Sequence, residues 1–193
     1  MNRRICPRCG SKKIAQILWG MPAFSDDLDK KIKNMEIILG GCCISDNDPT
    51  YHCNTCKKDF GRPTSFDEIA ANKIHFVLGG YFGGYHNVTV TRTINGAITK
   101  YMPPNDAIID ITTIGKDLSV DEWRKFIRDL FRCYIRDWKT SYIDTDYCDG
   151  TQWKLVISFD GKPALKRDGS NAYPPHWKKF MSVFRKYISK EIK

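Results

Sequence analysis

Two Cys-x-x-Cys pairs, at residues 6–9 ("CPRC") and 53–56 ("CNTC"), restrict the fold of this chain more than any other feature. Each such turn presents two sulfurs to one ion, and two turns together supply the four ligands of a tetrahedral zinc site. A site closed by four thiolates has no open position for chemistry, which is typical of structural zinc. The sequence therefore predicts one structural Zn2+ per chain, bound by Cys6, Cys9, Cys53 and Cys56.

Two further cysteines, Cys42 and Cys43, lie between these pairs. Adjacent residues of an extended segment point to opposite faces, so the two side chains should not both reach one ion. We expect two free thiols, one buried as a small apolar side chain and the other partly exposed. A vicinal redox pair is the alternative. His52, next to Cys53, could replace one of the cysteines as a ligand. In an extended segment, however, its side chain points to the opposite face from Cys53 and away from the ion.

The compartment follows from the cysteine usage and from the apolar pattern. No apolar run among the 193 residues is long enough to cross a bilayer, and the first residues do not form the apolar stretch of a signal peptide. These features predict a cytoplasmic protein with no membrane partner. In that reducing environment, the eight cysteines indicate metal binding rather than a disulfide framework.

The chain is predicted to form two domains, a zinc ribbon over residues 1–62 and an α+β domain over residues 63–193. In the second domain, apolar residues alternate with a period of two in the segments 74–78, 88–94 and 153–159. Hairpin turns at Asn95-Gly96 and Asp160-Gly161 predict return strands over 97–102 and 162–167, and a further strand is expected over 107–113. The period changes to that of a helix over 119–138 and 177–188. An antiparallel sheet with two amphipathic helices packed on one face accounts for both patterns.

The core of the second domain should combine apolar side chains of these strands and helices. Ser119 and Glu122 match a capping box, which places the start of the first helix. One core is expected to contain Trp123, Phe126, Leu130, Tyr134, Trp153, Leu155, Ile157, Phe180 and Phe184.

A glycine- and aromatic-rich stretch, "GGYFGGYH" at residues 79–86, is the most unusual part of the sequence. Tyr81, Phe82 and Tyr85 could stack on bases, as aromatic side chains do in proteins that bind single strands. The structural alternative is a twisted or bulged hairpin, in which glycines let two backbone segments approach closely. The stretch does not contain a phosphate-binding glycine motif.

The formal charge of +9 is concentrated in the last part of the chain. Residues 162–193 contain nine Lys or Arg and only two acids, Asp168 and Glu191, which gives a net charge of +7. Such a segment suits an acidic partner such as nucleic acid, or it is a solvated surface. The candidate contacts on the last helix are Lys178, Lys179, Arg185 and Lys186.

The segments "CPRCGS", "ILGGCCISDNDP" and "YHCNTC" resemble the zinc-ribbon segment of a group of uncharacterised bacterial proteins. The likeness covers about the first 62 residues, and "DGTQW" and "GSNAYPPHW" also resemble recurring segments of such proteins. It implies a bacterial or phage origin and a zinc ribbon, but no reaction. In these proteins a glycine often follows the second Cys-x-x-Cys pair, where this chain has Lys57. After the first pair this chain has a glycine, Gly10.

Together these features predict a non-enzymatic zinc-ribbon protein that contacts nucleic acid through its basic C-terminal helix. The alternative is a protein-binding regulator or adaptor that uses the ribbon as its interaction module. An enzyme of unknown type comes third, because the sequence contains no paired nucleophile and base and no His-Glu-x-x-His or Gly-x-Ser-x-Gly motif.

Overall fold

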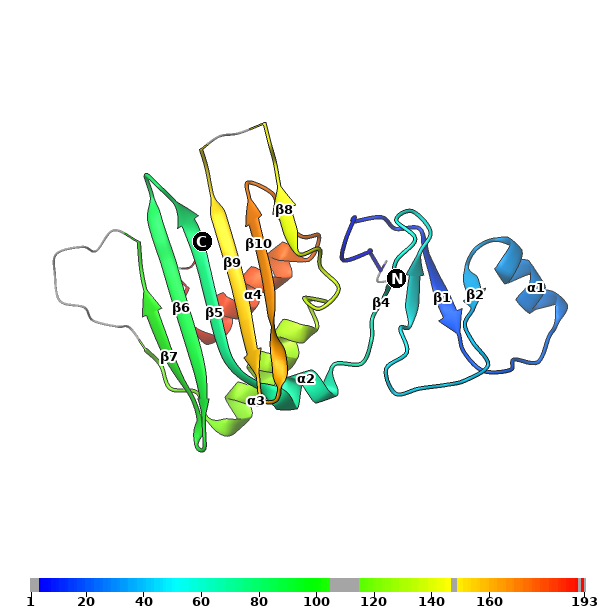
Figure 1. The fold of residues 1–193 in the computed structure, drawn as a ribbon, viewed down its shortest axis with the longest axis horizontal. Coiled ribbons are helices and arrows are strands. Elements are labelled where there is room, and N and C mark those ends of the chain that lie inside the picture. The colour runs from blue at the N-terminus through cyan, green and yellow to red at the C-terminus, as the bar shows by residue number, and fades with distance from the viewer. Residues whose placement is uncertain (1–3, 105–114, 147–148, 191, 193) are drawn as a thin grey trace. The chain divides into compact units, whose positions relative to one another are not determined.

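The computed structural model describes residues 4–104, 115–146, 149–190 and 192. The chain divides into two compact units, Met1–Thr64 and Ser65–Lys193, each with its own sheet (Figure 1). The fold is thus a mixture of helices and strands, as the sequence predicts. The predicted strand over 107–113 and Cys148 lie outside the described residues.

The first unit is a small four-stranded sheet with one helix. Its elements are β1 (Ile14–Leu18), α1 (Asp26–Lys33), β2 (Ile37–Leu39), β3 (Tyr51–Cys53) and β4 (Asp59–Phe60), in the strand order β2-β1-β3-β4. The crossover through α1 makes β1 and β2 parallel, whereas β3 and β4 are antiparallel neighbours. The Ser25 side chain caps α1 by accepting a hydrogen bond from the backbone N–H of Leu28.

This unit buries few apolar side chains. Besides two of its cysteines, its buried apolar residues are Ala15, Ile17, Leu28 and Phe60. A set this small cannot offset the conformational entropy of about 60 ordered residues, so small domains of this kind usually depend on a metal or disulfides.

In its described residues, the second unit is a six-stranded sheet with three helices. Its elements are α2 (Ser65–Ala70), β5 (Ala71–Gly80), β6 (Gly84–Thr93), β7 (Gly96–Met102), α3 (Val120–Phe131), β8 (Ser141–Ile143), β9 (Gln152–Phe159), β10 (Lys162–Ser170) and α4 (Trp177–Tyr187). The strand order is β7-β6-β5-β9-β10-β8.

The sheet departs from the purely antiparallel arrangement at one edge, where β8 runs parallel to β10. No hairpin turn joins these two strands, because β9 lies between them in the sequence. Strand β8 is not among the strands that the sequence predicts. Its three residues are too few to produce a visible alternation of apolar and polar side chains.

Helices α3 and α4 lie on the same side of this sheet (Figure 1). Ile74, Phe76 and Leu78 point towards them from β5, and all three are buried. The Phe76 ring lies 5.2 Å from Phe180 and 4.6 Å from Phe184, measured between ring centroids, so strand and helix share one core. Of the predicted core residues, those buried in this cluster are Trp123, Phe126, Leu130, Trp153, Leu155, Ile157, Phe180 and Phe184.

Tyr134 is the exception among the predicted core residues. Helix α3 starts at the predicted capping box of Ser119 and Glu122, but it ends at Phe131 rather than near residue 138. Tyr134 then adopts a left-handed backbone conformation with φ of 57°. The helical spacing no longer applies beyond that point, so the ring is only half-buried and packs beside His176.

The hairpin between β6 and β7 turns at Ile94 and Asn95, one residue before the predicted Asn95-Gly96 turn. Gly96 is already paired with Thr93 in the sheet. A Cβ atom at Gly96 would lie 1.9 Å from the carbonyl oxygen of Leu118. The glycine is therefore required by the close approach of the segment before α3.

Candidate metal centre

The sheet of the first unit brings the two Cys-x-x-Cys turns together. In the antiparallel pairing of β1 with β3, Ile14 lies opposite Cys53. The first turn immediately precedes β1, and the second connects β3 to β4. The 43 residues between Cys9 and Cys53 therefore do not separate the turns in space.

Both turns have the same backbone hydrogen bonds. The N–H of Gly10 donates to the carbonyl of Cys6 at 3.0 Å, and the N–H of Lys57 donates to the carbonyl of Cys53 at 2.8 Å. Gly10 and Lys57 both adopt left-handed conformations, with φ of 75° and 55°. Lys57 thus adopts the left-handed backbone conformation that favours glycine. For a residue with a Cβ atom this conformation costs about 1–2 kcal/mol.

The four cysteine sulfurs have the spacing of a tetrahedral metal site. All four Sγ atoms lie within 4.8 Å of one another, with Cys6–Cys56 at 3.7 Å and Cys9–Cys53 at 3.6 Å. A tetrahedron with bonds of about 2.3 Å has edges of about 3.8 Å, whereas a disulfide requires about 2.05 Å between sulfurs. The group can therefore hold one metal ion, and the four are free thiols.

The electrostatics of the site differ among its thiols. Burial raises the pKa of Cys6 to about 12. Burial also opposes ionisation of Cys53, but hydrogen bonds from the backbone N–H groups of Cys56 and Thr55 lower its pKa to about 7. Cys53 is thus prepared to ionise near neutral pH, whereas burial raises the pKa of Cys6 and Cys56, and the charge of a cation would help these two thiols to lose their protons.

Cys42 and Cys43 lie in the segment between β2 and β3, outside the four-cysteine group. Both are exposed, so the expectation that one is buried is wrong. Their Sγ atoms are 3.9 Å apart because the segment is bent rather than extended. The His52 ring is hydrogen-bonded elsewhere, because its Nδ1 lies 2.6 Å from a carboxylate oxygen of Asp59.

We expect Cys42→Ser and Cys43→Ser, combined in one chain, to leave the metal content unchanged. The substituted hydroxyls stay in an exposed bend, so neither the turns nor the sheet should respond. Elemental analysis of the purified variant against the unsubstituted chain measures this. Loss of the metal would make one of these thiols a ligand.

The aromatic residues predicted to stack on bases lie at the turn between β5 and β6. Tyr81 and Phe82 are 88% and 82% exposed, and Tyr85, at the start of β6, is 42% exposed. The stretch forms a hairpin, and a Cβ atom at Gly79 would lie 2.0 Å from the carbonyl oxygen of Gly84. The structural interpretation of the glycines is thus correct, and the exposed rings are still available for contacts.

The basic residues predicted on α4 are all exposed, but three of them have partners within the chain. Lys179 donates to the carbonyl of Arg132, and Arg185 donates to the carbonyl of Ile192. Lys186 hydrogen-bonds to the hydroxyl of Tyr187 and to a carboxylate oxygen of Asp129, which raises the pKa of Lys186. Much of the cationic character of this helix is therefore used in holding α4 to its surroundings.

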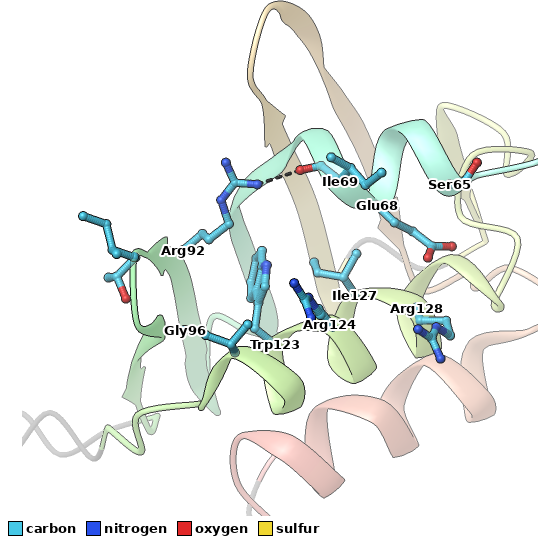
Figure 2. Close-up of a pocket in the computed structure, with 12 residues that line it drawn as sticks. Ser65, Glu68, Ile69, Arg92, Gly96, Trp123, Arg124, Ile127 and Arg128 are labelled. Carbon is cyan, nitrogen blue, oxygen red and sulfur yellow. Dashed lines mark hydrogen bonds between the residues drawn. The ribbon is translucent and has the colours of Figure 1, made fainter.

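A hollow of about 480 Å³ lies between α2, α3 and the β6–β7 hairpin. Its lining combines apolar residues such as Ile69, Trp123 and Ile127 with arginines. Figure 2 shows Arg92 at its rim, donating to the backbone carbonyl of Ile69, and the same guanidinium also pairs with Asp160. The lining also includes the hydroxyl of Ser65 and the carboxylate of Glu68 (Figure 2).

The structure also gathers four lysines that no pattern in the sequence groups together. They lie on the sheet face opposite the helices, on four different strands: Lys73, Lys100, Lys154 and Lys166. Each occupies a polar position of an alternating strand. Alternation indicates which residues share a face of one strand, but not which strands are neighbours.

In the described part of the chain, no helix is both long and apolar enough to cross a membrane. Comparison of the whole chain with protein-family models, with curated proteins and with solved structures finds no significant match. The clearest functional feature of the described residues is the group of four thiols that could hold a metal ion.

Proposed function

We propose that the four cysteines bind zinc and that the ion has a structural role. An all-sulfur donor set with tetrahedral spacing suits Zn2+ in preference to hard cations such as Mg2+ or Ca2+, which take oxygen ligands. The observation that supports this best is the set of Sγ distances, 3.6–3.7 Å for the two hydrogen-bonded pairs. The small core of the first unit gives the ion a clear purpose, because metal binding can supply folding free energy.

We further propose that the protein acts by binding, with nucleic acid as its partner. The net charge of +9 favours a polyanion, and Tyr81 and Phe82 are large aromatic side chains held out in water. Because three of the predicted basic residues of α4 are engaged within the chain, the aromatic hairpin is the stronger of the two candidate surfaces. Of the four basic residues predicted on α4, Lys178 is the best candidate for direct contact with nucleic acid.

A salt titration of binding tests this proposal. We expect the zinc-loaded full chain to bind labelled DNA or RNA, and the logarithm of the binding constant to fall linearly with the logarithm of salt concentration. The slope should be about −0.7 per phosphate contact for a single strand. Fluorescence anisotropy at several salt concentrations measures it. Absence of binding at low salt, with zinc content confirmed, would contradict the proposal.

A protein-binding adaptor is the second candidate, and one feature of the first unit favours it. Among the described residues 4–64, five large apolar side chains are exposed: Met21, Phe24, Met35, Leu39 and Ile44. Such side chains suit a protein partner that buries apolar area. Binding of that kind should persist as salt concentration rises, which separates the two candidates.

A further inference from the structure

We propose that the open face of the six-stranded sheet is a binding surface for single-stranded nucleic acid, with one base seated beside Tyr85. The proposal rests on the proposed function and adds the surface and the form of the nucleic acid. It differs from a contact through α4, because α4 packs against the opposite face of the sheet. Figure 1 looks onto the open face, with both α3 and α4 behind the strands.

The strand register defines which side chains occupy this face. His75 pairs with Thr89 on one side and with Val156 on the other. Thr89 pairs in turn with Lys100, and Val156 pairs with Lys166. These five residues form one row across β7, β6, β5, β9 and β10, about 19 Å wide at about 4.8 Å per strand.

The face has a cationic excess. Lys73 and Lys154 lie in the rows on either side of the His75 row, about 7 Å from it along the strands. Among the described residues whose side chains share this face, Asp168 is the one acid. All four lysines are exposed, and none forms an ion pair with a carboxylate of the described residues. These groups are therefore available to phosphates, unlike Lys179, Arg185 and Lys186 of α4.

One end of the face is hollowed to a volume of about 530 Å³. Tyr85 and Ile143 belong to its lining, together with Val77, which lies in the row next to His75. Gly79 pairs with both Tyr85 and Gln152, so these two lining residues lie on the strands at either side of β5. An aromatic ring beside an open space is the arrangement on which unpaired bases stack.

Polar groups in the same hollow could read the edge of a base. Gln152 offers an amide donor and acceptor, and Asp168 offers a carboxylate that already accepts a hydrogen bond from the Ser141 hydroxyl at 2.7 Å. Lys154 lies directly opposite Asp168 across the strand pair. Stacking on a side chain and hydrogen bonds to the Watson–Crick edge both require an unpaired base, so the hollow favours a single strand over a duplex. The basic side chains of the sheet face can hold the adjoining backbone.

Two variants with the same change in charge separate this surface from α4. The first replaces Lys73, Lys100, Lys154 and Lys166 with glutamine. The second replaces Lys178, Lys179, Arg185 and Lys186 with glutamine. Binding to labelled oligothymidine and oligouridine is measured by anisotropy over a range of salt concentrations, with a duplex of the same length as a competitor and with circular dichroism to confirm folding.

We expect the first variant to make the slope of log binding constant against log salt shallower by about 2.8, from four contacts at about 0.7 each. The second variant should keep most of the slope. Tyr85→Leu should weaken binding by roughly 5- to 140-fold through lost stacking, and Tyr85→Phe should retain it. Comparison of the oligothymidine and oligouridine shows whether DNA or RNA is preferred.

Three results would overturn the inference while leaving the proposed function in place. They are loss of binding in the α4 variant alone, equal losses in both variants, and tighter binding of the duplex than of the single strands. If the unsubstituted chain binds no nucleic acid of any form, the proposed function fails and the sheet-face surface fails with it.

Discussion

Replacing Cys53 with serine is expected to release the metal and to unfold the first unit. Cys53 is fully buried, its pKa is about 7, and its Sγ lies 3.6 Å from that of Cys9. A serine hydroxyl is a poor ligand for zinc and stays protonated. Binding of zinc to small modules supplies on the order of 10 kcal/mol, which exceeds what the few buried apolar residues of this unit can provide.

The measurement has two parts, metal content and residue-resolved hydrogen exchange. Exchange should become fast over residues 4–64 and should change little over the described residues of the second unit, which has its own core. The Cys42→Ser, Cys43→Ser variant is the matched control, because it makes the same chemical change at exposed thiols. Retention of a full metal equivalent in Cys53→Ser would show that Cys53 is dispensable as a ligand.

The second large effect is expected from Phe126→Ala, which should lower the free energy of unfolding of the second unit by about 3–5 kcal/mol. Phe126 is fully buried on α3, with its ring centroid 5.8 Å from that of Phe184 and 5.6 Å from that of Tyr187. The substitution removes the ring contacts between α3 and α4 and leaves a cavity that neighbours on a packed sheet cannot fill. Denaturant titration followed by tryptophan fluorescence measures the loss.

Phe66→Ala is the control for that prediction. It makes the same change in side chain, but Phe66 is 67% exposed on α2, so its removal should alter stability by no more than about 0.5 kcal/mol. A comparable loss in both variants would mean that the effect comes from helix propensity or from the unfolded state. The stability loss of Phe126→Ala would then not support a central place for Phe126 in the core.

The group of four thiols is the part of the candidate site that the sequence specifies most completely. Four thiols in two Cys-x-x-Cys turns satisfy a local rule, because each turn positions its own pair of sulfurs within a few residues. Capping at Ser119 is local in the same sense and is found where predicted. The apolar periodicities likewise identify the buried faces of β5, β9, α3 and α4.

Predictions that depend on the surroundings of a residue are less successful. Cys42 and Cys43 are expected on an extended segment, but they lie in a bend whose shape depends on how the connection from β2 to β3 is closed. Tyr134 continues a helical pattern that the chain leaves at Phe131. In both cases the side-chain spacing is compatible with a regular element, and packing elsewhere decides that the element is absent.

By itself, the sequence determined the elements whose signals are short-range: the metal ligands, the capped start of α3 and the alternation of each strand. Tertiary structure decided the order of the strands, because β5 contacts β9 across more than 70 residues of sequence and no local pattern encodes that pairing. The order in turn decides which lysines share the open face. A surface assembled from four separate strands is therefore a property of the folded sheet, whereas each Cys-x-x-Cys turn is already specified by a few adjacent residues.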